Sequence, residues 1–402
     1  MAKSSQHQIV PVRKSYCGVK STSSAVRIYR NVDELPEAWN TILPLKHFLR
    51  TNTLLLAEKA ALPDITHLYV GYFDGEKLIA VAYFQQLAVC RYHLNDENLP
   101  FITKTAWRTI CGVLCPRLLV AGHLFHHEIS TFHSRTKGAY ESYTIYAAMM
   151  DACVQYSRAK ALLIKDLPQN LVTHFQNLKP DFIRMPNDIS MEMKVDPEWT
   201  SIKDYEKALK HKYAQRYRKV RSQMNGVSVS EMSLEEVIKH QDPIFKLYNQ
   251  VANNQQVRLG YLSAAYLPML KKSFEKAFRI WGFFKDGELI AFYSAWQYNG
   301  TLDMYYIGFD YESNKQHNLY FNMLFFGVET AIESRCKLLI MGRTALEAKA
   351  RLGCEPKYLS TFLCISNSWI RRWFNSMSPR QEGEEWENRH PFLDKKGLVE
   401  AV

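Results

Sequence analysis

The sequence predicts an α/β (α+β) fold with two tandem domains, each built on a mixed, mostly antiparallel central sheet flanked by helices. The first observation is a repeat, since residues 71–80 read GYFDGEKLIA and residues 282–291 read GFFKDGELIA. Each copy places a turn containing Asp and Gly between two apolar runs, which is a strong signal for a β-hairpin. The second observation is that a long helical segment and a short aliphatic strand, at 160–164 and 337–340, follow each hairpin. A third is the length of 402 residues, which exceeds one ordinary domain.

The first domain is predicted over residues 25–196, after a Ser-, Lys- and Gln-rich tail at 1–24 that we expect to be mobile. Residues 90–118 have no counterpart in the second half, and we interpret them as an insertion. Apolar side chains at helical spacing from Tyr143 to Val154 indicate a helix. The expected elements are, in order, a strand at 26–29, the hairpin at 67–89, a strand at 118–122, a helix at 140–158 and a strand at 160–164.

The second domain is predicted over residues 197–377, before a polar, Glu-rich tail at 378–402 that we expect to be loosely attached. It begins with a strongly basic helix at 203–224, which Asn225 and Gly226 end. The elements expected after it are helices at 234–251 and 264–278, the hairpin at 279–297, a strand at 301–309, a helix at 318–334 and a strand at 337–342.

Composition and charge limit the class of protein. A hydrophobic content of 47% and an aromatic content of 13% suffice for two cores and exclude wholesale disorder. The formal net charge of +11 favours an anionic partner, which includes nucleic acid, an anionic lipid surface and a phosphate-rich cofactor. Surface charge that serves only solubility is an equally good explanation of the same number.

The cysteine pattern and the apolar runs indicate a cytoplasmic protein. Cys111 and Cys115 lack a second cysteine pair at zinc-finger spacing, so we expect reduced thiols and no metal. The N-terminus lacks the apolar stretch of a secretory signal, and charged residues or proline interrupt the longest apolar runs. The aromatic and basic segment 368–377 suits either an anionic membrane surface at the inner face or packing on a core.

The order of elements and three segments resemble the GNAT acyl-CoA N-acyltransferase fold, and two such units in tandem resemble the Fem-type aminoacyltransferases. The first segment, 209–220 (LKHKYAQRYRKV), is similar to the basic helix that opens the second unit in those proteins. The second is 306–310 (YIGFD) with the loop leading to Asn318, and the third is 341–353 (MGRTALEAKARLG), which resembles the closing strand and a Glu-x-Lys-x-x-x-Gly stretch. The resemblance covers roughly residues 26–375.

The chain departs from the acetyl-CoA members of the family. Those enzymes carry an Arg/Gln-x-x-Gly-x-Gly/Ala loop, whose backbone amides hold the cofactor pyrophosphate at a helix N-terminus. The second half has Lys315 to Asn318 at that place without a glycine, and the first half has 135–140 (RTKGAY), which ends in Tyr140. The helix after strand 337–342 also lacks the tyrosine that often protonates the leaving thiolate. The resemblance still implies an acyl-CoA or another acyl-thioester as co-substrate, with no permanently bound cofactor.

Direct acyl transfer to an amine requires positioning, an oxyanion site and a proton acceptor, and these requirements define the candidate residues. Asp303 and Glu347 are candidate bases, although a surface carboxylate at Asp303 and a simple ion pair of Glu347 with Arg351 are the alternatives. His123, at a strand end, is a third catalytic candidate. The predicted cofactor-binding residues are Arg343, Lys349, Asn318 and Tyr305.

The sequence therefore predicts an acyltransferase that moves an acyl group from a thioester to an amine, which is lipid-like under one hypothesis. One alternative is a Fem-type enzyme that takes an amino acid from aminoacyl-tRNA to a cell-wall precursor and binds the RNA through its basic helix. A second alternative is a binding protein without catalysis, whose duplicated fold has lost the cofactor loop. The expected partners are a small-molecule donor and an amine, with tRNA only under the first alternative, and the oligomeric state is left open.

Overall fold

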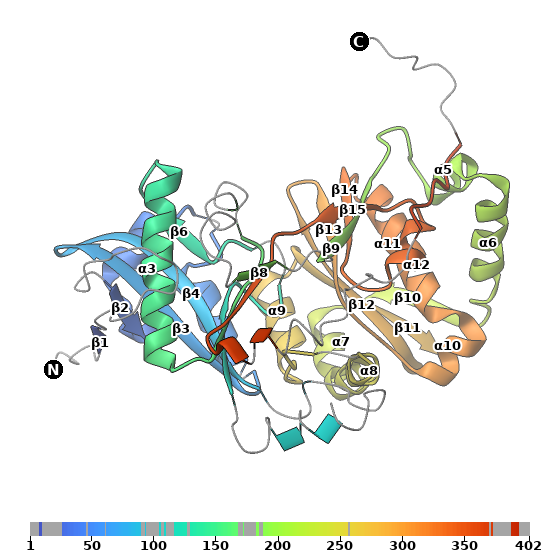
Figure 1. Cartoon of the computed structure of the whole chain (residues 1–402). Coiled ribbons are helices and arrows are strands. Elements are labelled where there is room, and N and C mark those ends of the chain that lie inside the picture. Colours follow the sequence, from blue (N-terminus) through green and yellow to red (C-terminus); the bar gives the residue numbers. More distant parts are fainter. Residues whose placement is uncertain are drawn as a thin grey trace, which may run out of the picture. The chain divides into compact units, whose positions relative to one another are not determined.

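The computed structural model describes residues 8–9, 26–45, 47–60, 62–89, 93, 104–105, 108–109, 116–126, 129–167, 172, 182–184, 188–255, 258–369, 371–372 and 387–393. The chain forms two compact units (Figure 1). Unit 1 comprises residues 1–188, 256–263 and 359–380, and unit 2 comprises residues 189–255, 264–358 and 381–402. The predicted insertion and the two predicted tails lie mostly outside the described residues.

Unit 1 is built on a mixed sheet in which the described strands β5 and β7 pair in parallel and the other neighbours pair antiparallel. The sequence-distant β16 is part of this sheet because it pairs with both β7 and β8. Along the sheet the strands are β1 (Gln8–Ile9), β2 (Val26–Tyr29), β3 (Ile65–Asp74), β4 (Lys77–Ala88), β5 (Arg117–Ala121), β7 (Ala161–Ile164), β16 (Phe362–Ile365) and β8 (Phe182–Arg184), and β6 (Phe132–Ser134) also pairs with β4.

Helices cover both faces of the unit 1 sheet. The long helix α3 (Ala139–Ser157) crosses one face, as Figure 1 shows. Its apolar side is buried there. The opposite face is covered by the short helices η2 (Val32–Glu34) and η3 (Glu37–Ile42) and by α1 (Thr51–Lys59), around the fully buried Trp39. The helix that the sequence predicts at 140–158 is thus confirmed.

Unit 2 repeats this plan with a second mixed sheet. Its strands, in order across the sheet, are β10 (Val227–Glu231), β11 (Phe278–Lys285), β12 (Glu288–Tyr298), β13 (Thr301–Phe309), β14 (Leu338–Gly342), β9 (Ile189–Lys194) and β15 (Glu355–Tyr358). Only β13 and β14 pair in parallel among these strands. Two mostly antiparallel sheets, each with one parallel pair joined through a helix, confirm the predicted α/β fold class with two tandem domains.

Helices also flank the second sheet on both faces. One face buries α11 (Leu319–Glu333) with α5 (Ile202–Ala208), α6 (His211–Ser222) and α12 (Leu346–Ala350). The other helices are α7 (Leu234–Lys239), α8 (Gln241–Asn253), α9 (Tyr266–Phe274) and α10 (Tyr311–His317). Gly308 lets α8 approach β13, because a Cβ atom there would lie 2.6 Å from the backbone nitrogen of Tyr248.

The repeated segments form equivalent hairpins, β3–β4 and β11–β12. Both have a register irregularity next to the turn, at Tyr72/Phe73 and at Phe283/Phe284. In each copy the aromatic ring two residues after the first glycine covers that glycine: an added Cβ would meet Phe73 at 2.8 Å and Phe284 at 2.6 Å. The shared Gly-x-Phe pattern therefore has a packing reason in both units.

The single basic helix predicted at 203–224 is wrong in one respect, because the chain breaks it into α5 and α6. Leu209 and Lys210 are extended, and the amide of Lys210 donates to the carbonyl of Pro391 at 2.7 Å. Phe392 forms a bridge with Leu209 and packs on Trp199 and Tyr205. Residues 387–393, part of the tail expected to be loosely attached, thus interrupt the helix from far along the chain.

The predicted domains are continuous stretches of the sequence, whereas the units of the structure are not. The ranges 25–196 and 197–377 treat each domain as continuous, whereas each unit consists of separate stretches. Residues 189–194 form β9, which pairs with β14 and β15 in unit 2.

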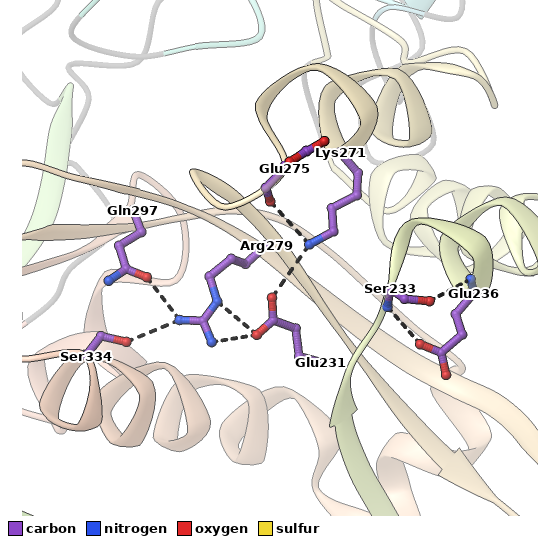
Figure 2. Close-up of polar contacts among 8 residues, drawn as sticks. All are labelled: Glu231, Ser233, Glu236, Lys271, Glu275, Arg279, Gln297 and Ser334. Atoms are coloured by element: carbon purple, nitrogen blue, oxygen red, sulfur yellow. Dashed lines mark hydrogen bonds and ion pairs between the residues drawn. The ribbon is translucent and has the colours of Figure 1, made fainter.

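A polar network connects elements at one end of the unit 2 sheet (Figure 2). The guanidinium of Arg279 on β11 donates to Glu231 at 2.6 and 3.0 Å, to Gln297 at 3.0 Å and to Ser334 at 3.2 Å. Lys271 on α9 adds an ion pair with Glu231 at 3.6 Å. The network links β10, β11, β12, α9 and the end of α11.

Four of the cysteines lie among the described residues, and all four are buried free thiols: Cys153, Cys336, Cys354 and Cys364. No helix in the described part of the chain has both the length and the apolar character needed to cross a bilayer.

Candidate functional site

The parallel pair in unit 2 comes apart halfway along its longer strand. In this fully described stretch, β13 and β14 pair through Thr301–Leu338, Leu302–Leu339 and Asp303–Ile340, and the ladder ends there. β13 nevertheless continues to Phe309. The β13–β14 ladder therefore stops at Asp303, and we call the place where the two strands separate the β13–β14 opening.

A β-bulge lies directly beside this opening. Tyr293 pairs with Ile307 and Ala295 pairs with Met304, so Tyr305 and Tyr306 both face the single residue Ser294. The Ser294 hydroxyl is fully buried; it donates to the Tyr306 carbonyl at 2.9 Å and accepts from the Tyr306 amide at 3.0 Å. A bulge leaves one residue without its regular ladder bonds. Here the Ser294 hydroxyl bonds the amide and carbonyl of Tyr306 instead, and it fixes the backbone at the opening.

Asp303 and Tyr305 occupy the same stretch of β13. Asp303 is only 7% exposed, so the surface carboxylate considered from the sequence is wrong. Trp296 is its cross-strand neighbour on β12, and the Trp296 ring lies 6.1 Å from that of Tyr305. Asp303 is therefore a buried residue at the end of the parallel ladder, with Trp296 opposite it on the neighbouring strand.

The hydroxyl of Tyr305 faces a second phenol. It lies 3.1 Å from the hydroxyl of Tyr266, which begins α9. Burial raises the pKa of Tyr305 well above its usual range, and the neighbouring Tyr266 raises it further. Burial also raises the pKa of Tyr266. Both phenols are thus neutral at physiological pH and can donate a hydrogen bond.

Glu347 is held by two guanidinium groups. Its carboxylate accepts from Arg351 at 2.9 Å, in the i,i+4 pair considered from the sequence, and from Arg389 at 3.0 Å. Partial burial acts to raise the pKa of Glu347, but Arg389 and Arg351 outweigh it and the pKa is lowered. A carboxylate in this position is a weak proton acceptor, and it anchors the segment 387–393.

The predicted cofactor-binding residues are spread over several elements of unit 2. Lys349 lies on α12 with 3% of its surface exposed, and Arg343 follows β14 and is half-buried. Asn318 stands between α10 and α11 in the left-handed region, with φ of 50°, and its side-chain amide donates to Gln223 at 2.8 Å. Among these residues only Tyr305 lies on the same strand as Asp303.

His123 belongs to unit 1, where it is 3% exposed. Its Nδ1 atom accepts from the amide of Phe125 at 3.1 Å, and its ring stacks on Tyr83. Burial holds the pKa of His123 well below its usual value, and the nearby His126 lowers it further. His123 is therefore a neutral imidazole inside an aromatic and histidine cluster of unit 1.

Three residues of the unit 2 site were not predicted: Ser294, Tyr266 and Trp296. A bulge leaves no periodic signal in the sequence. The one feature that could have indicated Ser294 is a serine inside an otherwise apolar strand. Tyr266 approaches Tyr305 from a distant helix, and such contacts depend on the tertiary structure.

No protein-family model and no curated protein matches this sequence. Similar solved structures include FemX, with 9% identity over 78% of this chain and 91% of that chain and a TM-score of 0.43. L-PGS from Bacillus licheniformis has 9% identity over 79% of this chain and 91% of its own, with a TM-score of 0.44. A GCN5-related N-acetyltransferase from Kribbella flavida has 10% identity over 85% of this chain and 72% of its own, with a TM-score of 0.45. Likenesses at this level describe the course of the chain and not its chemistry.

Proposed function

We propose that the protein is an acyltransferase whose second unit moves an acyl group from an activated donor to an amine. The observation that carries the proposal is the opening between β13 and β14, with a bulge fixed by Ser294 and a buried carboxylate at its edge. Main-chain amides beside a bulge are suited to stabilise the oxyanion of a tetrahedral intermediate, because they are held in place before the reaction begins.

In the proposed reaction the amine nitrogen attacks the carbonyl carbon of a thioester. A C–N bond forms, the C–S bond breaks, and Asp303 takes the proton that the amine loses. The leaving thiolate takes up a proton from water, and the Tyr305 hydroxyl, whose raised pKa keeps it neutral, can donate a hydrogen bond to the sulfur. Positioning supplies much of the remaining rate enhancement in such a direct transfer.

A second donor class, an aminoacyl ester carried on RNA, is favoured by one observation. Lys212 and Lys219 lie on the exposed side of α6, while its apolar side is buried in the core. The chemistry at the β13–β14 opening is the same for an ester as for a thioester, so both donors fit the proposed site.

The experiment is a search for amide products by mass spectrometry. The purified protein is incubated with mixed amines and, separately, with acyl-CoA, acyl groups on a carrier protein, and aminoacyl-tRNA. An amide that forms only with enzyme, donor and amine together is the expected result. If no donor gives an amide while ligands still raise the melting temperature, the protein is a binding protein and the proposal fails.

A further inference from the structure

The amino-terminal end of α11 is the place where this fold offers backbone amides to an anion. α11 follows β13 through α10 and has 15 residues, and the amide of Asn322 makes the first regular helical bond, to the carbonyl of Asn318 at 3.0 Å. The amides before it need other acceptors, and in acetyl-CoA enzymes of this fold the cofactor pyrophosphate supplies them.

A side chain of the protein itself, that of Asn314, binds a backbone amide at the amino-terminal end of α11. The Oδ1 atom of Asn314, on α10, accepts from the amide of Tyr320 at 2.9 Å. A phosphate oxygen would have to take the position that this Oδ1 atom occupies. Leu319, the first residue of α11, is completely buried, so its side chain already packs against the core at the same turn.

α10 is held in place by a buried histidine. His317, at its end, is 8% exposed; its Nδ1–H donates to the carbonyl of Gln223 at 2.8 Å, and its Nε2 accepts from Lys285 at 2.9 Å. Asn318 is bonded to the Gln223 side chain as well. These bonds attach α10 to the end of α6 and to β11, so Asn314 is carried by a fixed element.

The connection from β13 to α11 also contains no glycine. No glycine occurs between Gly308 and Gly327, whereas a pyrophosphate can approach main-chain amides closely only where glycines leave them uncovered. The pyrophosphate of CoA does not fit this end of α11. We infer that the chain closes its own pyrophosphate site, and that the acyl donor is an ester or thioester on a carrier other than CoA. This inference rests on the proposed acyl transfer.

The test is CoA binding measured by calorimetry in phosphate-free buffer, with inorganic pyrophosphate as competitor. The wild-type protein should give no saturable binding at millimolar CoA. Asn314→Gly frees the Tyr320 amide, so this variant should bind CoA about tenfold or more tightly than the wild type does. Pyrophosphate should displace the bound CoA. Asn314→Asp keeps an acceptor oxygen and should stay closed, and Gln316→Ala, at an exposed position of the same helix, is the matched control.

Two results would overturn the inference. One is wild-type CoA binding that pyrophosphate displaces, a measurement that does not depend on any variant folding correctly. The other is an Asn314→Gly protein with a native melting curve that gains no CoA binding. Neither result bears on the proposed function, because amide formation from each donor is measured separately.

Discussion

Ser294 holds the β-bulge of the candidate site in place through its hydroxyl group. Its hydroxyl is bonded to both backbone groups of Tyr306, so its removal leaves a buried amide and carbonyl without that partner. We expect Ser294→Ala to lower the free energy of unfolding by about 1–3 kcal/mol and to lower amide formation more than this loss explains. Chemical denaturation and product formation measure the two effects. Ser228→Ala, at an exposed strand position, should change neither, and a Ser294→Ala enzyme with normal activity would show that the bulge has no role.

His67 in unit 1 is predicted to make stability depend on pH. Burial lowers its pKa to about 4, and its Nδ1 lies 2.6 Å from the Tyr83 hydroxyl. An unfolded histidine has a pKa of about 6.5, so between that value and about 4 the unfolded chain binds more protons than the folded one. Stability contributed by neutral His67 should therefore be lost progressively as the pH falls through this window.

Melting temperatures at a series of pH values between 7.5 and 4.5 test this expectation. His67→Gln keeps a hydrogen-bonding side chain that does not titrate, and it should flatten the decline. His211→Gln, at an exposed position, should leave the curve unchanged. An identical pH profile for wild type and His67→Gln would contradict the assignment.

At the scale of elements, Arg279 joins strands and helices that are far apart in the sequence. Its guanidinium contacts Glu231, Gln297 and Ser334 (Figure 2). It also lies over the Trp281 ring, 4.5 Å from the ring centroid. We expect Arg279→Ala to lower the free energy of unfolding by about 2 kcal/mol, because it removes charge-assisted bonds and a cation–π contact together. Denaturant unfolding measures this loss. Lys276→Ala, exposed and close in sequence, should have little effect, and equal stabilities for the two variants would exclude a structural role for the network.

The elements predicted correctly are those whose signal is local. The helix at 140–158 and the two hairpins follow from spacing and turn residues, and α3, β3–β4 and β11–β12 confirm them. The break between α5 and α6 could not be predicted, because the bonds of Lys210 to Pro391 and of Leu209 to Phe392 join distant segments. The same reason applies to β16, which returns to the sheet of unit 1.

The candidate site was predicted only in part for the same physical reason. Strand alternation placed Asp303 and Tyr305 on one element, as the structure has them. The bulge at Ser294 and the approach of Tyr266 depend on register and on tertiary packing, which a single sequence does not display. Glu347 looked like a base from its position in the motif, and its two guanidinium partners become visible only when residue 389 is placed in space.

For the whole molecule, the net charge of +11 suits an anionic partner as well as it suits solubility, and α6 is where we propose that such a partner would bind. Because the apolar residues Ala214, Tyr217 and Val220 are buried, α6 has no free apolar side to insert into a bilayer, which favours RNA. We expect Lys212→Glu with Lys219→Glu to weaken tRNA binding and to reduce its salt dependence by about one unit of slope per lysine.

Filter binding or fluorescence anisotropy at several salt concentrations measures this effect. Lys272→Glu with Lys276→Glu, two exposed lysines near the end of α9, is the charge-matched control. Equal losses in both double variants would mean that only net charge matters. Weaker binding to anionic vesicles with unchanged tRNA binding would assign α6 to a lipid surface instead.

We propose that Asp303 accepts the proton when unit 2 transfers an acyl group. Once a donor and an amine are identified, the most direct measurement is the single-turnover rate of amide formation by Asp303→Asn. We expect a fall of about a hundredfold or more at unchanged stability, with no fall for Asp286→Asn, the same substitution at an exposed turn. A rate for Asp303→Asn equal to that of the wild type would contradict it.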